Sequence, residues 1–106
     1  MDDNIEVLSA TLTNPLGLHA RPSVKLTRLA KTFASEIEMA AGAEEPWIDT
    51  KSIVKVMALK AAKGLTLRFR AKGPDAAEAL AALKTLVVSG FAEDEGLSEK
   101  AEPLNG

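Results

Sequence analysis

Residues 65–71 constrain the possible fold more than any other segment of the chain. Apolar and polar side chains alternate strictly along it, with Leu65, Leu67, Phe69 and Ala71 set against Thr66, Arg68 and Arg70. Because successive side chains of a strand point to opposite faces, this pattern predicts a β-strand with one buried and one solvated face. Such a strand requires a sheet whose apolar side is covered by other elements.

Helical patterns alternate with the strands. The first has Pro22 in its first turn and an apolar stripe with a 3.6-residue period, formed by Pro22, Leu26, Leu29, Ala30 and Phe33. The second is short, and Thr50 or Ser52 is expected to cap its start. The third begins with Pro74 near its first position and Asp75 favouring its dipole, and Gly90 is expected to end it. Its buried stripe consists of Ala76, Leu80, Leu83 and Val87.

Further strands are predicted at residues 4–12, 35–39 and 47–49, and the last two form a hairpin around the loop 41–46. The chain order is therefore strand, helix, strand, strand, helix, strand, helix. We predict an α+β open sandwich, a four-stranded and mainly antiparallel sheet with helices packed on one face. Residues 1–90 form this single domain, and the acidic residues 91–106 form a disordered tail.

Composition and charge exclude several classes of function. Cysteine is absent and histidine occurs once, so we expect no metal site. We also expect no cofactor. Five acids and one lysine give residues 91–106 a charge of −4, so residues 1–90 carry +2 within a chain of −2. This mildly basic body favours an acidic or phosphorylated protein partner. No aromatic residue is interleaved with the cations, which argues against nucleic acid.

The sequence carries no export or membrane pattern. The N-terminal segment is short and acidic, whereas a signal peptide begins with a basic region followed by an apolar stretch. No apolar run approaches the length of a membrane span. We therefore expect a cytoplasmic monomer without membrane insertion.

His19, the single histidine, lies in residues 17–22 (GLHARP), where a turn leads into the first helix. A helix start offers unpaired N–H groups and the positive end of the dipole, and Arg21 adds a guanidinium that can bind phosphate oxygens. An imidazole can attack a phosphoryl donor. Gly17, Ala20 and Pro22 would support this site by shaping the helix start. Considered alone, however, a histidine beside glycine and proline is more often a surface or capping residue.

Two motifs carry a family resemblance. Residues 17–22 resemble the active-site motif of HPr, the histidine-containing phosphocarrier family of the bacterial phosphoenolpyruvate-dependent phosphotransferase system. Residues 49–53 (DTKSI) resemble that family's second motif, around a regulatory serine. The likeness covers about residues 4–90. It implies the open-faced β-sandwich of that family.

The resemblance implies a phosphoryl carrier rather than a self-standing enzyme. His19 would accept the phosphoryl group on Nδ1 from enzyme I and pass it to the A domains of sugar permeases or to a regulatory equivalent. Arg21 would neutralise and orient the group. Both residues would be the catalytic ones.

The same resemblance assigns roles around Ser52. Ser52 matches a serine that a dedicated kinase modifies in some bacteria, which implies a serine kinase and phosphatase as further partners, although the residues alone favour a helix cap. The partner-docking surface would consist of the apolar residues Ile53, Val54 and Met57 and the cations Lys25, Arg28 and Lys55. A phosphate on Ser52 would place negative charge beside this surface.

The sequence departs from the family pattern in three places. The loop 41–46 is longer than expected, Lys60 stands where a glycine is common, and the acidic tail extends past the last helix. The tail raises the alternative of a linker within a longer, multidomain phosphotransferase.

Two other functions stay open at this stage. One is a ligand-sensing α+β module in which His19 is incidental, and a small molecule that changes stability would indicate it. The other is a non-catalytic interaction module controlled through Ser52, against which the presence of His19 argues.

Overall fold

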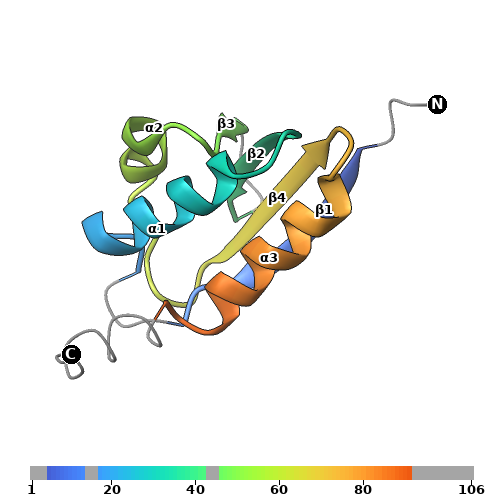
Figure 1. The fold of residues 1–106 in the computed structure, drawn as a ribbon. Helices are drawn as coiled ribbons and strands as arrows, with labels where there is room; N and C mark the ends of the chain where they lie inside the picture. The colour runs from blue at the N-terminus through green and yellow to red at the C-terminus, as the bar shows by residue number, and fades with distance from the viewer. Residues whose placement is uncertain (1–4, 14–16, 43–45, 92–106) are drawn as a thin grey trace, which may run out of the picture.

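The computed structural model describes residues 5–13, 17–42 and 46–91. Its elements, in chain order, are β1 (Glu6–Thr11), α1 (Ala20–Lys31), β2 (Glu36–Ala41), β3 (Ile48–Asp49), α2 (Ile53–Ala58), β4 (Thr66–Lys72) and α3 (Ala76–Val88). The strands pair antiparallel in the order β1-β4-β2-β3. The helices α1 and α3 lie side by side over one face of the sheet, and α2 lies beside α1 (Figure 1). The predicted α+β open sandwich is confirmed.

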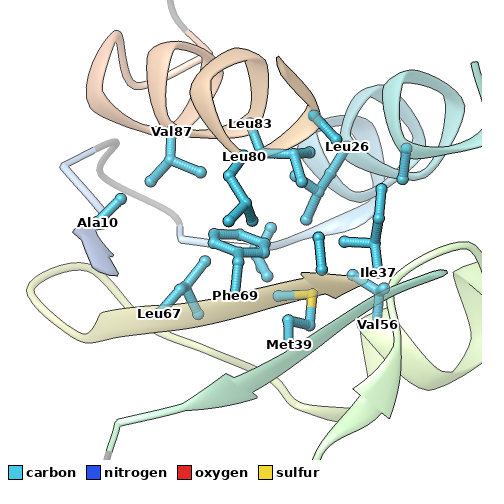
Figure 2. Close-up of a cluster of buried hydrophobic side chains, with 14 of the residues drawn as sticks. Ala10, Leu26, Ile37, Met39, Val56, Leu67, Phe69, Leu80, Leu83 and Val87 are labelled. Carbon is cyan, nitrogen blue, oxygen red and sulfur yellow. The ribbon is translucent and has the colours of Figure 1, made fainter. Parts of the chain in front are cut away.

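The strand β4, which the alternating pattern predicted, lies between β1 and β2. Its Phe69 is opposite Leu8 on one side and Met39 on the other, so the apolar faces of three strands form one surface. The helices cover this surface, and Figure 2 shows the ring of Phe69 beneath Leu80 and Leu83 of α3. Burial of this aliphatic layer is the main source of stability, because each buried Leu or Phe contributes about 1.5–3 kcal/mol.

The opposite face of β4 carries its polar side chains. The guanidinium carbons of Arg68 and Arg70 lie 4.7 and 4.2 Å from the centre of the Trp47 ring, in cation–π geometry. Arg70 also forms an ion pair with Glu38 of β2. Its Nε donates a hydrogen bond to the Glu38 carboxylate at 2.7 Å, and its terminal nitrogen lies 2.6 Å from the same carboxylate. Trp47 was expected in a strand, but β3 begins one residue later. Its ring instead covers the arginines of the sheet's solvent face.

The end of α3 corrects the predicted domain boundary. Gly90 (φ +72°) ends the helix as expected, its N–H donating to the carbonyl of Val87, while the N–H of Phe91 donates to Leu86. These two bonds form a Schellman motif, which characteristically places an apolar residue after the glycine. Phe91, assigned to the tail, is fully buried in the core. The packed unit therefore extends through Phe91, and the tail predicted for residues 92–106 lies outside the described residues.

Asp75 connects the start of α3 to the turn between α1 and β2. Its carboxylate makes no capping bond to its own helix. It accepts hydrogen bonds from the Ser35 hydroxyl (2.6 Å), the Ser35 N–H (2.9 Å) and the Ala34 N–H (3.0 Å). The Ser35 hydroxyl, followed by the Ala34 N–H, holds the pKa of Asp75 below its ordinary value. Pro74, expected near the first helical position, lies two residues before Ala76.

We expect Asp75→Asn to destabilise the protein at neutral pH and to have little effect in acid. Because the folded-state pKa is lowered, the stabilisation is present above the unfolded-state pKa of about 4 and is lost as the pH falls through the lower folded-state value. Urea unfolding across this range measures the effect, with Glu78→Gln, an exposed acid of the same helix, as control. An Asp75→Asn effect of constant size at every pH would contradict the assignment.

Candidate functional site

The loop that carries His19 is held by the loop that follows α2. The N–H of Leu18 donates to the carbonyl of Ala61 at 2.9 Å, and both side chains are buried. Gly17 has a φ of +68°, and a Cβ there would lie 2.4 Å from the Ala61 oxygen and 2.9 Å from the Cα of Ala62. Only glycine fits a backbone that is both left-handed and this close to another chain segment. Gly17 therefore fixes the approach of the two loops.

His19 occupies the N-cap position of α1. Its backbone is extended (φ −89°, ψ −166°), and its carbonyl accepts the first helical hydrogen bond, from the N–H of Ser23 at 3.1 Å. The imidazole makes no capping hydrogen bond, and the residue is half-exposed. The capping interpretation that the sequence left open is thus wrong for the side chain. The ring therefore lies at the helix start but does not cap the helix.

The first turn of α1 consists of Ala20, Arg21 and Pro22. The N–H groups of the first two have no acceptor within the helix, and Pro22 has no N–H, so the expected placement of proline in the first turn is confirmed. Pro22 is buried and anchors the turn, whereas Ala20 and Arg21 are exposed. The turn contains no acidic side chain. It therefore presents a positive helix end and a guanidinium within two residues of the imidazole.

The predicted cations lie along α1 beyond Arg21. Lys25 is half-exposed and Arg28 is exposed, one and two turns further along the helix, respectively. Residues 17–35 contain no acidic side chain. The structure therefore places an uninterrupted row of positive charge on the helix that starts at His19.

Ser52, rather than Thr50, caps α2. The Ser52 oxygen accepts a hydrogen bond from the N–H of Lys55 at 3.3 Å, which confirms the helix cap. Thr50 is fully buried, and its N–H donates to Ile37 of β2 at 3.0 Å. Lys51, which the sequence did not single out for this role, donates from Nζ to the carbonyl of Phe33 at 2.9 Å. This bond ties the segment before α2 to the end of α1.

The apolar residues expected on the docking surface differ in exposure. Val54 is 74% and Met57 39% exposed, whereas Ile53 is half-buried. Val56, which the sequence did not identify, is fully buried and holds α2 against the core. We call the exposed pair Val54 and Met57 the α2 surface. Lys55 is exposed beside it.

The α2 surface and His19 lie close to one another in the fold. Helix α2 packs against α1, and the segment that leaves α2 supplies the Ala61 carbonyl that holds Leu18. In Figure 1, the short helix α2 lies over the first half of α1. The structure thus brings two motifs about thirty residues apart in the sequence to the same end of the molecule.

Within residues 5–13, 17–42 and 46–91, no three His, Cys, Asp or Glu side chains gather as a metal site would require. None of the described helices is long and apolar enough to span a membrane.

Comparison with known proteins matches both the sequence and the fold. The family model described as the PTS HPr component phosphorylation site matches residues 8–89. Phosphocarrier protein HPr of Cupriavidus necator is 45% identical over 85 residues, which are 80% of this chain and 93% of that protein. Phosphocarrier protein NPr of Escherichia coli is 40% identical over 83 residues, 78% of this chain and 91% of that protein. The crystal structure of HPr-C-His from Thermoanaerobacter tengcongensis superimposes with a TM-score of 0.76 at 31% identity, covering 82% of this chain and 96% of that one.

We expect Gly17→Ala to destabilise the protein by about 2–4 kcal/mol, because the new methyl group would both strain a left-handed residue and overlap the Ala61 carbonyl. Urea unfolding measures the loss. The NMR signals of the His19 ring should shift as the two loops separate.

Gly64→Ala is the matched control for this prediction. Gly64 also has a positive φ (+92°), but a Cβ there would meet no atom within 4 Å. It should therefore show only the conformational cost, about 1 kcal/mol. Equal losses in the two variants would show that the contact with Ala61 does not matter.

Proposed function

The chain belongs to the HPr family of phosphotransferase-system phosphocarriers, and from this premise we propose that His19 is the residue that carries the phosphoryl group. The observation that supports this assignment best is the imidazole at the N-cap of α1, half-exposed and making no capping bond. A ring in this place can reach an incoming phosphorus atom. The phosphoryl oxygens would then meet the first-turn N–H groups of the helix.

The transfer needs few groups of this chain. A lone pair on Nδ1 of His19 attacks the phosphorus, a new N–P bond forms, and the bond between phosphorus and the donor breaks with its electron pair returning to the donor. The guanidinium of Arg21 and the positive end of α1 offset the dianionic charge of the phosphoryl group. The backbone of Gly17 and the buried ring of Pro22 keep the helix start in position, and Ala20 contributes an N–H.

A carrier must also release its group. His19 lies at a half-exposed helix end rather than in a closed pocket, so a second protein can approach the phosphorylated ring. Stabilisation by one arginine and a helix end is moderate, and water competes with it. The group is therefore held without being trapped. This suits a carrier better than a self-standing enzyme.

The partners are proposed from the family and from the charge of the site. We infer that enzyme I donates the group and that A domains of sugar permeases, or the equivalent proteins of a regulatory branch, accept it. The similar identities to proteins named HPr and NPr support either branch. The row of Arg21, Lys25 and Arg28 would bind acidic surfaces of these partners, and Val54 and Met57 would pack against them. Such a chain would act in the cytoplasm as a monomer.

We expect incubation with phosphoenolpyruvate and enzyme I to add one acid-labile phosphate to the protein, because a histidine N–P bond hydrolyses readily in acid. Intact-mass analysis before and after acid treatment measures it. His19→Ala should fold normally, since the ring makes no capping bond, and should gain no phosphate. An equal gain in His19→Ala, or none in the parent, would refute the assignment.

We further propose that Ser52 is a regulatory site, modified by a serine kinase and restored by a phosphatase. Ser52 is the N-cap of α2, where a negative charge is compatible with the helix. A phosphate there would therefore leave the fold intact. It would add negative charge at the edge of the α2 surface, where it would repel an acidic partner.

We expect Ser52→Asp to lower kcat/KM for transfer from enzyme I by about ten-fold while leaving the unfolding temperature nearly unchanged, because aspartate also caps helices. Ser52→Ala is the matched control. It should cost about 1 kcal/mol of stability through the lost cap and change transfer little. Transfer to Ser52→Asp at the parent rate would show that charge at this position does not regulate docking.

A further inference from the structure

Lys60 has a backbone conformation that its side-chain contacts do not explain. Its φ is +49°, in the left-handed region that residues with a Cβ avoid. Among the described non-glycine residues, Phe91 shares this feature (φ +56°), but Phe91 is fully buried and its packing offsets the strain. Lys60 is exposed, and no hydrogen bond or ion pair joins its side chain to any residue that the structure describes. No polar contact within the described part of the fold therefore accounts for a lysine at this position.

Lys60 lies beside the clamp that positions His19. Its N–H donates to the carbonyl of Met57 at 3.1 Å and so ends α2. The next residue, Ala61, supplies the carbonyl that accepts the N–H of Leu18 at 2.9 Å. Lys60 is thus bonded on one side to the α2 surface and adjacent on the other to the His19 loop.

The charge around Lys60 is of one sign. Neither residues 17–35 nor residues 51–73 contain an acidic side chain. The exposed cations of the second segment that lie nearest to the end of α2 are Lys55, Lys60 and Lys63. Because α2 packs against α1, the segment that carries these lysines lies beside the helix that carries Arg21, Lys25 and Arg28. Carboxylates on a protein that docks there would complement the cations of both segments.

We propose that Lys60 is a specificity-determining residue for phosphoryl transfer, whose ammonium group pairs with a carboxylate of the donor protein docked on the α2 surface. This inference rests on the proposed function. A glycine would relieve the backbone but would remove the cation, so the strained conformation is explained by the contact that the charge makes. Lys60 thus contributes to the binding of the donor protein, and it takes no part in the phosphoryl transfer at His19.

The experiment measures transfer from phosphorylated enzyme I of the same organism to the parent, Lys60→Gly and Lys60→Arg. Lys60→Gly should raise KM about five-fold and leave kcat within about two-fold, because a single exposed charge contributes modestly to encounter and docking. Lys60→Arg should restore the parent KM. The difference between Lys60→Gly and the parent should vanish at high salt, where exposed charges are screened.

Stability gives an independent readout. Lys60→Gly should unfold a few degrees higher than the parent, because glycine adopts the left-handed conformation without strain. If Lys60→Gly has a higher KM than the parent and is also more stable, damage to the fold cannot explain the higher KM. Lys84→Ala, which removes an exposed cation from α3, is the matched control and should leave KM unchanged.

The outcomes separate this inference from the proposed function. If the parent accepts no phosphate, both fail. If the parent is phosphorylated and Lys60→Gly has the same KM, the inference about Lys60 alone is wrong. A lower kcat that Lys60→Arg does not restore would also overturn it, because it would indicate a structural effect on the His19 loop.

Discussion

The hydrogen bond between the N–H of Leu18 and the carbonyl of Ala61 is the interaction on which the site depends. It joins the loop before α1 to the loop after α2, and the close approach at Gly17 leaves no room for a side chain between them. Leu18 and Ala61 are both buried, so the bond is shielded from water and difficult to replace. As a result, the segment that carries the histidine is joined directly to the segment that leaves α2, and a docking partner can contact both.

The rest of the fold supports these two joined loops and leaves His19 and the α2 surface accessible. The aliphatic layer between the sheet and the helices supplies the stability, and Val56 fastens α2 to it while Val54 and Met57 stay on the surface. Asp75 and Lys51 join the turns at the far end of α1 to α3 and to the start of α2. Acidic side chains are kept out of both segments around the site. A carrier requires this combination, because its group must be reached by successive partners and held only moderately.

Much of the fold follows from periodicity. The alternation around Phe69 and the stripe through Leu26 predicted the central strand and the first helix, because local side-chain direction decides both. Two features were not predicted from the sequence, one marked by a local motif and one that depends on distant residues. Phe91 looked like the first residue of a tail, although glycine followed by an apolar residue is the pattern of a Schellman motif. Asp75 was expected only to favour the dipole of its helix, and nothing in the sequence indicated its hydrogen-bond partners about forty residues away in the chain.

The sequence by itself determined the elements, their order, the family resemblance and the proposal of His19 as the phosphoryl-carrying residue, because periodicity and short motifs are local properties. Only the tertiary structure decided which residues act together. It showed that the His19 ring makes no capping hydrogen bond to its helix. It showed that the carbonyl of Ala61 leaves no room for a side chain at Gly17. It also showed that Lys60, the residue before Ala61, has a left-handed backbone conformation. The last two of these depend on the approach of the loop before α1 to the loop after α2, and distances between segments far apart in the chain are fixed only when the core forms.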